Sequence, residues 1–126
     1  MKEYEKWFRK AESDILTIEN NLNAASTPSD ACCFHAQQAA EKYLKAYLVS
    51  RNINFPKTHD LKYLLNACAE INNKFSSIEL PVFSLFTYGV TPRYPDDLDE
   101  PTILDAQLAY NNAIIIKEFI LKHFFE

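Results

Sequence analysis

The sequence contains very little glycine: of its 126 residues, only Gly89 is one. Hairpins and β-barrels use glycine repeatedly at turns that require a positive φ angle, so this scarcity argues against an all-β fold. A glycine-rich phosphate loop is excluded as well, because a single glycine cannot form one. Long helices are therefore favoured.

Cysteine is also scarce, and neither cysteine nor histidine follows a metal-binding pattern. Cys32, Cys33 and Cys68 include no CxxC pair, and an odd number of cysteines in such a chain is typical of reduced thiols. The histidines are widely separated and form no HExxH motif. We therefore expect no metal and no cofactor. A Cys–His nucleophile through Cys32 or Cys33 stays open beside the simpler interpretation that both are small core residues.

No long hydrophobic run is present. The first residues, MKEYEKWFRKAESD, are charged from the second position onward and are unlike a signal peptide. The most apolar stretch, 113–125, is interrupted by Lys117, Glu118 and Lys122 and is no membrane span. The net charge of −4 and the pI near 5.4 argue against a broad basic surface, though not against a small basic site. These features predict a soluble cytoplasmic protein that does not enter a membrane.

The composition is that of one globular domain. Hydrophobic residues make up 48% and charged residues 24%, so we expect residues 1–126 to fold as a single domain around one core. Apolar residues recur at steps of three and four, which is the period of an α-helix. The predicted helices cover about 3–24, 29–51, 59–73, 78–88 and 102–125. The expected fold class is therefore all-α, an up-and-down bundle of four to five helices.

Polar residues at the predicted helix starts are suited to capping. Ser29 or Asp30 can cap the second helix and Thr58 the third, because a short side-chain oxygen accepts hydrogen bonds from free backbone N–H groups of the first turn. Thr102 and Asp105 have the spacing of a capping box at the start of the last helix.

The last predicted helix is apolar over most of its circumference. A helix of this kind must be covered from several sides. It is therefore either the central helix of the bundle or a helix whose outer side is covered by another subunit. The residues concerned are Leu104, Leu108, Ile114, Ile115, Ile116, Phe119, Ile120, Leu121 and Phe124.

The second predicted helix carries a polar stripe apart from its apolar arc. At 100° per residue, His35, Gln38, Lys42 and Lys45 fall on one side, with Glu41 at the edge. One interpretation is a solvated helix face. The other is a surface that meets a ligand, an RNA or a partner, because Gln and Lys donors at this spacing suit phosphate contacts.

The segment Pro56-Lys-Thr-His-Asp60 marks the start of the third helix. His59 and Asp60 are expected in its first turn, after Thr58. The amino terminus of a helix attracts anions in any case, so capping and phosphate binding by this segment are compatible.

The segment 90–101 is rich in proline and acidic residues and is expected to be a stiff polar loop. Within it, Arg93 and Tyr94 are restricted by flanking prolines. Arginine can bind phosphate through two hydrogen bonds, and tyrosine can stack on a base. In the alternative interpretation, Arg93 braces its own loop through an acid such as Asp96.

Three motifs together resemble one family. They are FHAQQAAEKYLKA from Phe34, PKTHDL from Pro56 and PRYPD from Pro92. In this order, on an all-helical chain of this length, they are similar to a prokaryotic HEPN domain (higher eukaryote and prokaryote nucleotide-binding). The type is the one associated with minimal nucleotidyltransferases and similar to the helical substrate-binding subunit of these enzymes. The resemblance covers nearly the whole chain. It implies a homodimeric bundle that partners a minimal nucleotidyltransferase, in many cases as a toxin–antitoxin pair.

The resemblance also implies roles for the candidate residues. We expect a non-catalytic protein that binds a nucleotide, an RNA or another substrate for the partner enzyme. In this interpretation Arg93 and Lys42 contact phosphate, and Tyr94 packs against a base or ring. The remaining candidates line the site: His35, Gln38, His59 and Asp60.

The alternative within the same family is a metal-independent endoribonuclease toxin. Its composite site at the dimer cleft would combine Arg93 with His35 and His59. The ribonuclease members carry an arginine that is followed, after four to six residues, by a histidine. Here the next histidine after Arg93 is His123, and seven residues separate Arg51 from His59. This departure from the motif favours the binding protein.

Overall fold

The computed structural model describes residues 1–90 and 100–126, and of residues 88–90 it describes the backbone alone. The described residues form helices and connections, and none of them is in a strand. The elements are α1 (Glu3–Leu22), α2 (Ser29–Ser50), α3 (Leu61–Ile71), the short 3-10 helix η1 (Asn73–Ile78), α4 (Glu79–Val90) and α5 (Ile103–His123). The predicted all-α bundle is confirmed. Arg93 and Tyr94 lie outside the described residues.

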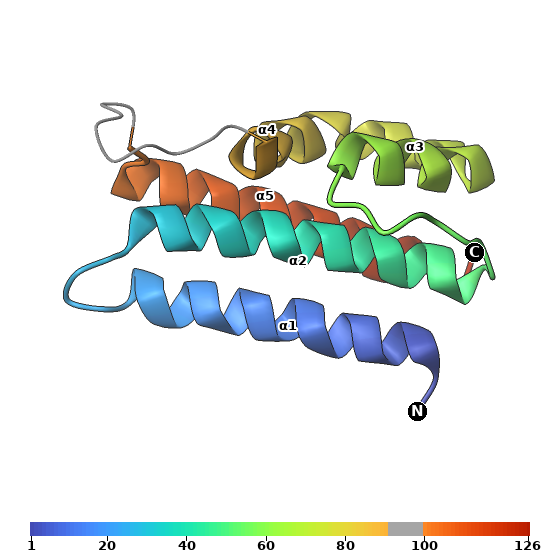
Figure 1. Ribbon diagram of the computed structural model, residues 1–126, viewed down its shortest axis with the longest axis horizontal. Helices are drawn as coiled ribbons and strands as arrows, with labels where there is room; N and C mark the ends of the chain where they lie inside the picture. Colours follow the sequence, from blue (N-terminus) through green and yellow to red (C-terminus); the bar gives the residue numbers. More distant parts are fainter. Residues whose placement is uncertain (91–99) are drawn as a thin grey trace.

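Helix α2 is the centre of the bundle. It packs against α1, α3, α4 and α5, and Figure 1 shows α1 on one side of it and the other helices on the opposite side and behind it. The connection between α2 and α3 turns back along α2, so these two helices run in the same direction (Figure 1). Of the two alternatives for the last helix, the one that makes it the central helix of the bundle is therefore excluded. The central place belongs to α2 because four of its five alanines are fully buried and let neighbouring helices approach closely: Ala36, Ala39, Ala40 and Ala46.

The apolar faces predicted for the first two helices form much of the core. On α1, Ala11, Ile15 and Ile18 are buried, with Tyr4 and Phe8 packed against them. On α2, the whole predicted arc is buried: Cys33, Ala36, Ala40, Leu44 and Tyr47. Burying a large apolar side chain contributes about 1.5–3 kcal/mol. The contact between α1 and α2 is therefore a main source of stability.

The start of α3 differs from the prediction. Asp60 is the N-cap, and its Oδ1 accepts hydrogen bonds from the backbone N–H groups of Lys62 and Tyr63. Thr58 accepts a hydrogen bond from the N–H of Asp60 instead. The prediction that Thr58 caps this helix is wrong because the carboxylate two residues later reaches the same N–H groups and carries a charge that suits the helix dipole.

Of the two other predicted caps, that of α5 is confirmed and that of α2 is wrong. The capping box of Thr102 and Asp105 is confirmed, with both reciprocal hydrogen bonds present at 3.1 and 2.9 Å. Helix α2 begins at Ser29 directly after Pro28, and no side chain caps it. Asp30 instead accepts a hydrogen bond from the neighbouring N–H of Ala31.

The element η1 was not predicted. Its Phe75 is buried against the ring of Tyr47, with the centroids 4.6 Å apart and the planes at 18°, and against Phe119 at 4.9 Å. Six residues without a helical apolar period gave no sequence signal, and tertiary contacts hold the segment in place.

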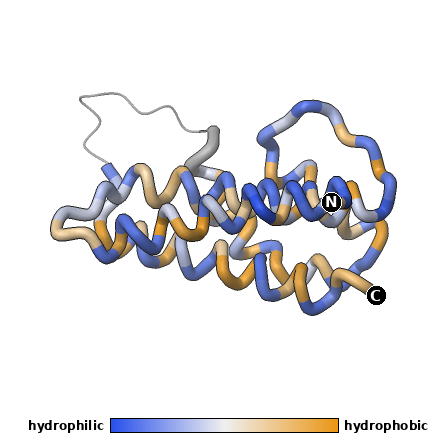
Figure 2. Tube along the Cα trace, turned by 90° about the horizontal axis from the view of Figure 1, so that it is seen from below, coloured by the Kyte–Doolittle hydropathy of each residue, from blue (hydrophilic) through white to orange (hydrophobic). Residues whose placement is uncertain are grey.

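Helix α5 buries one stripe and leaves an outer apolar face. Figure 2 shows hydrophobic and hydrophilic stretches alternating along the helices. On α5 the exposed large apolar residues are Ile103, Leu104, Leu108, Ile115 and Leu121. Among the described residues, no helix combines the length and the apolar character needed to cross a membrane.

Candidate functional site

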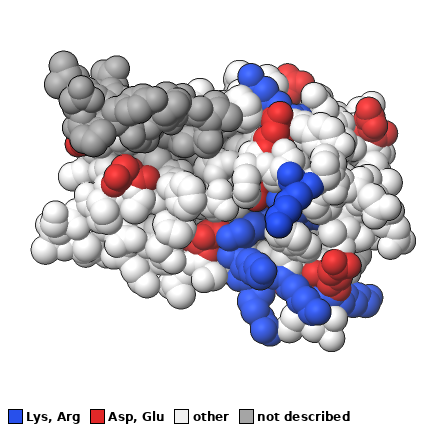
Figure 3. All heavy atoms as spheres, in the orientation of Figure 1, with Lys and Arg blue, Asp and Glu red and all other residues white. Residues whose placement is uncertain are grey.

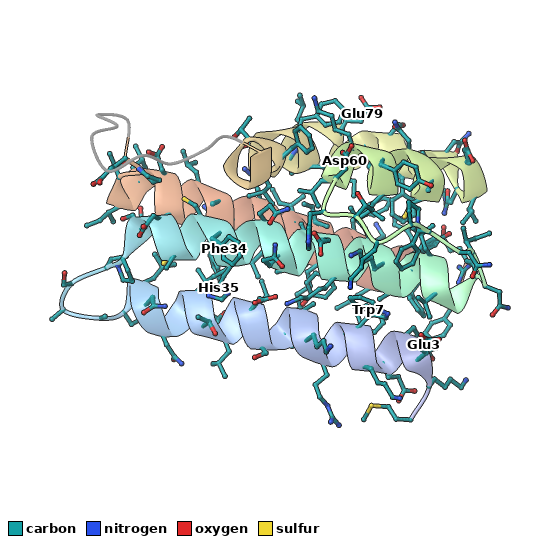
Figure 4. All side chains as sticks on the ribbon, in the orientation of Figure 1. Glu3, Trp7, Phe34, His35, Asp60 and Glu79 are labelled. Carbon is teal, nitrogen blue, oxygen red and sulfur yellow. The ribbon has the colours of Figure 1, made fainter. Side chains whose placement is uncertain are left out.

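Helix α1 contributes a nearly buried carboxylate to its contact with α2. The Asp14 side chain is 10% exposed; its Oδ1 lies 2.9 Å from Nδ1 of His35, and its Oδ2 accepts a hydrogen bond from Nζ of Lys42 at 2.6 Å. A carboxylate buried this far needs such partners, because leaving the charge unpaired costs several kcal/mol. Asp14 therefore holds two of the predicted site residues in place. Figure 4 shows His35 directed from α2 toward α1.

A second carboxylate, Glu41 on α2, organises another cluster. Its side chain is 3% exposed, and it pairs with Nζ of Lys45 at 3.2 Å and with Nδ1 of His59 at 2.8 Å. The Lys45 side chain is 7% exposed, whereas that of His59 is 75% exposed. Glu41 thus connects the interior of the bundle to a histidine at its surface.

Two glutamines of α2 add hydrogen bonds beside the second cluster. Nε2 of Gln38 donates to Oε1 of Gln37 at 2.8 Å, and Nε2 of the buried Gln37 donates to the backbone carbonyl of His59 at 3.4 Å. We call the side chains of His35, Gln38, Lys42 and His59, together with the carboxylates of Asp14 and Glu41, the polar face of α2. The bonds of Asp14 and of His59 join different elements, whereas the bond between Gln38 and Gln37 lies within α2.

Lys45 does not belong to the accessible part of the predicted stripe. Its ammonium lies 5.4 Å from the ring centroid of Trp7 and 5.7 Å from that of Phe55. The two rings contact each other at 6.4 Å. The interpretation of a uniformly solvated face therefore fails at this position, because Lys45 shares the side of Glu41 and is covered by α1 and the connection to α3.

Comparison with known proteins addresses the family of the chain. The model of the HEPN domain family matches residues 4–123. The chain belongs to the HEPN domain family. Its structure is similar to the crystal structure of an archaeal HEPN homologue, with a TM-score of 0.78 and 25% sequence identity over 98% of this chain and 99% of that one. No curated protein matches the chain in sequence.

The two histidines at the polar face of this HEPN domain share one arrangement. His35 and His59 each face a carboxylate through Nδ1. A carboxylate at Nδ1 orients the ring and leaves Nε2 to bind a ligand or to exchange a proton. Each of the two histidines can therefore offer Nε2 to an anion or take part in proton transfer.

Two other candidate residues have different places in this HEPN domain. The Asp60 carboxylate caps α3 and is engaged by two backbone N–H groups. Arg51 was set against His59 in the sequence because of the arginine-to-histidine spacing of the ribonuclease members. It donates to the carbonyls of Phe124 and Glu126 at 2.5 and 3.0 Å. Its guanidinium lies 4.5 Å from the ring centroid of Tyr47. Arg51 therefore fastens the carboxyl end of the chain and does not meet His59.

The cysteines of this HEPN domain are core residues. The side chains of Cys32, Cys33 and Cys68 are all buried. Burial raises the pKa of Cys32, with a smaller contribution from Asp30, and burial raises the pKa of Cys68. A thiol with a raised pKa is a poor nucleophile, so a Cys–His nucleophile through Cys32 finds no support. Among residues 1–90 and 100–126, no cluster of His, Cys, Asp and Glu could hold a metal ion.

A third carboxylate, Glu12, ties α1 to two helices. It accepts a hydrogen bond from the Tyr43 hydroxyl at 2.5 Å and pairs with Lys117 of α5 at 3.0 Å. Burial raises the pKa of Tyr43, and the hydrogen bond to Glu12 raises it further. Tyr43 therefore stays neutral and serves as a fixed donor between α1 and α2.

The anchoring carboxylates were missed as functional residues in the sequence. Asp14 had a signal, since it lies three residues after Ala11 and directly before Ile15, on the apolar side of α1. A charged residue among core positions requires a partner. The identity of that partner was not readable, because His35 and Lys42 lie on another helix.

Proposed function

We propose that this HEPN protein is a non-catalytic binding protein that forms a dimer, partners a minimal nucleotidyltransferase, and binds a nucleotide, an RNA or another phosphate-bearing substrate. The polar face of α2 is the observation that supports this most strongly. Its donors are held by Asp14 and Glu41 in the protein itself. Because these side chains are already ordered, little conformational entropy is lost when a ligand binds.

The charges of the polar face suit an anion. Lys42 and Lys45 each pair with one carboxylate, and Lys42, whose side chain is 22% exposed, is the ammonium that this face offers to a phosphate. Arg93 and Tyr94 add a phosphate contact and a stacking surface in this proposal, as expected from the sequence.

The dimer is supported by the outer apolar face of α5. Scattered apolar side chains at a surface are common, but here five large ones share a single helix. At 100° per residue, Leu104, Leu108 and Ile115 fall within about 40° of one another, and an exposed apolar stripe is a feature of protein interfaces. A second copy of the chain is the occupant that the family resemblance suggests.

Affinity purification of the tagged protein from its own host tests the partner. We expect a small nucleotidyltransferase to co-purify in stoichiometric amount and to be identified by mass spectrometry. A bare homodimer, recovered repeatedly under mild conditions, would contradict the partnership and leave the dimer standing.

Titration tests the binding site. With ATP and a short oligo-adenylate RNA as separate probes, the variant Lys42→Gln/His59→Ala is expected to bind about 10- to 100-fold more weakly than the wild type. The reason is that a hydrogen bond to a charged group is worth about 1.5–3 kcal/mol. Lys74→Gln is the matched control, since Lys74 lies on η1 and pairs with Glu126 away from α2. Equal affinity of the double variant and the wild type would contradict the assigned site.

A second function is favoured by the paired histidines. Both have the carboxylate-oriented geometry of a general acid or base. In this alternative the protein is a metal-independent endoribonuclease in which one histidine takes the proton of the attacking 2′-hydroxyl. The other protonates the leaving 5′-oxygen, and Arg93 stabilises the charge on the phosphorane.

Expression in a bacterial host separates the two functions. A ribonuclease is expected to arrest growth and to leave RNA fragments with 2′,3′-cyclic phosphate ends, and His35→Ala or His59→Ala is expected to relieve both effects. Normal growth together with intact RNA in a purified assay would exclude the ribonuclease.

A further inference from the structure

The amino-terminal half of α1 carries a basic pocket that the proposed function does not use. The pocket has a volume of about 420 Å³ and is lined by Met1, Glu3, Lys6, Trp7 and Lys10. Figure 3 shows Lys and Arg side chains gathered over this part of the molecule, in the lower part of the view. Residues 1–10 contain four Lys or Arg and two Glu, in a chain whose net charge is −4. The positive charge is therefore concentrated at one end of α1.

The lysines of this pocket are available to a ligand. Lys6 and Lys10 are exposed, and among the described residues neither has a carboxylate within ion-pair distance. Lys42 and Lys45, by contrast, are each neutralised by a carboxylate. Lys6 and Lys10 therefore add unpaired positive charge on α1.

Trp7 is a partly exposed aromatic surface between these lysines. Figure 4 shows it directed from α1 toward α2. Its ring is supported by Phe55 at 6.4 Å and by the ammonium of Lys45 at 5.4 Å, while Lys10 lies 5.9 Å from the ring centroid. A ring held by a neighbouring ring and a buried lysine is rigid, and rigid aromatic surfaces flanked by cations stack nucleobases.

We propose that Trp7, Lys6 and Lys10 form a base-stacking subsite for single-stranded RNA. One base stacks on Trp7 in the place of the exposed Lys10 ammonium, and Lys6 and Lys10 contact the adjoining phosphates. The subsite rests on the proposed function in one respect, since the same strand continues to the polar face of α2. Glu3 lies at the rim and disfavours a phosphate on its own side, so the strand runs toward Lys10.

The position of the subsite favours a strand over a mononucleotide. Trp7 and Asp14 are seven residues apart on α1, which corresponds to about 10 Å along the helix axis. Asp14 holds Lys42 and His35 at the far end of this span. Hydrogen-bond donors that can contact phosphates lie on both sides of the partly exposed Trp7 ring, and this arrangement suits successive nucleotides of a single strand. In a duplex the bases stay stacked on one another and are unavailable to Trp7.

The experiment uses Trp7 as its own probe, because it is the only tryptophan in the chain. A labelled oligo-adenylate of eight nucleotides is titrated by fluorescence anisotropy, and the quenching of Trp7 is followed in parallel with the unlabelled strand. We expect both signals to reach half-saturation at the same concentration. Trp7→Leu should weaken binding about 5- to 150-fold, and Trp7→Phe, which keeps a ring over Lys45, should retain most of the affinity.

Salt dependence tests the lysines. For single strands, log K falls against log salt with a slope of about −0.7 for each neutralised phosphate, so Lys6→Gln/Lys10→Gln should reduce the slope by about 1.4. Lys74→Gln should leave the slope unchanged.

The outcomes separate this subsite from the proposed function. Anisotropy binding without Trp7 quenching, and with full affinity in Trp7→Leu, would overturn the subsite and leave the polar face standing. Loss in Trp7→Leu with no loss in Lys42→Gln/His59→Ala would support the subsite and contradict the polar face. Equal quenching by AMP and by the oligonucleotide would overturn the assignment to a strand, and absence of RNA binding would overturn the subsite altogether.

Discussion

Replacing Glu41 with alanine is expected to lower the free energy of unfolding by about 3–5 kcal/mol. Glu41 is the buried partner of Lys45, whose side chain is 7% exposed and covered by Trp7 and Phe55. Removing the carboxylate leaves the ammonium buried without its counter-charge, and this desolvation is the main cost. A loss of this size lowers the melting temperature by roughly 10–20 °C. Calorimetry or circular dichroism measures it.

The double variant Glu41→Leu/Lys45→Met shows whether the unpaired charge is the cause. Replacing both members of a buried pair by apolar residues is often neutral for stability, so most of the loss is expected to be recovered. His59 loses its carboxylate in this variant, and ligand binding at the polar face should stay weak although the fold is restored. A single Glu41→Ala variant as stable as the wild type would contradict the role of this cluster.

Replacing Phe75 with alanine is expected to destabilise the protein by about 3–5 kcal/mol as well. The ring is buried between Tyr47 and Phe119 and attaches η1 to α2 and α5. Removing the ring leaves a cavity in the core beside η1, a segment that tertiary contacts hold in place. Chemical denaturation with guanidinium chloride measures the change.

Lys74→Ala is the matched control for Phe75. The two residues are neighbours in η1, but Lys74 is exposed and makes only a surface ion pair with Glu126. Such a pair contributes at most about 1 kcal/mol. If both variants unfold at the same denaturant concentration as the wild type, η1 is not a stabilising element of the fold.

The sequence by itself determined the helices and much of the core. Steps of three and four between apolar residues are a local property, and they predicted α1, α2 and α5 to within three residues at either end. The reciprocal cap of Thr102 and Asp105 depends on four consecutive residues and was predictable for the same reason. The family motifs indicated the HEPN fold, because their order and spacing are sequence properties.

The tertiary structure alone decided which polar side chains meet. Asp14 pairs with Lys42, which is 28 residues later in the sequence, and Glu41 pairs with His59, which is 18 residues later. These pairings depend on the angle at which α1 and the connection to α3 cross α2, and no local pattern encodes that angle. Lys45 is the clearest example. The helical period predicted that it belongs to a polar stripe, but Trp7 and Phe55 pack over its ammonium and bury the charge. The helical period of the sequence therefore specified the helices. The pairing of buried charges from distant parts of the chain specified the site.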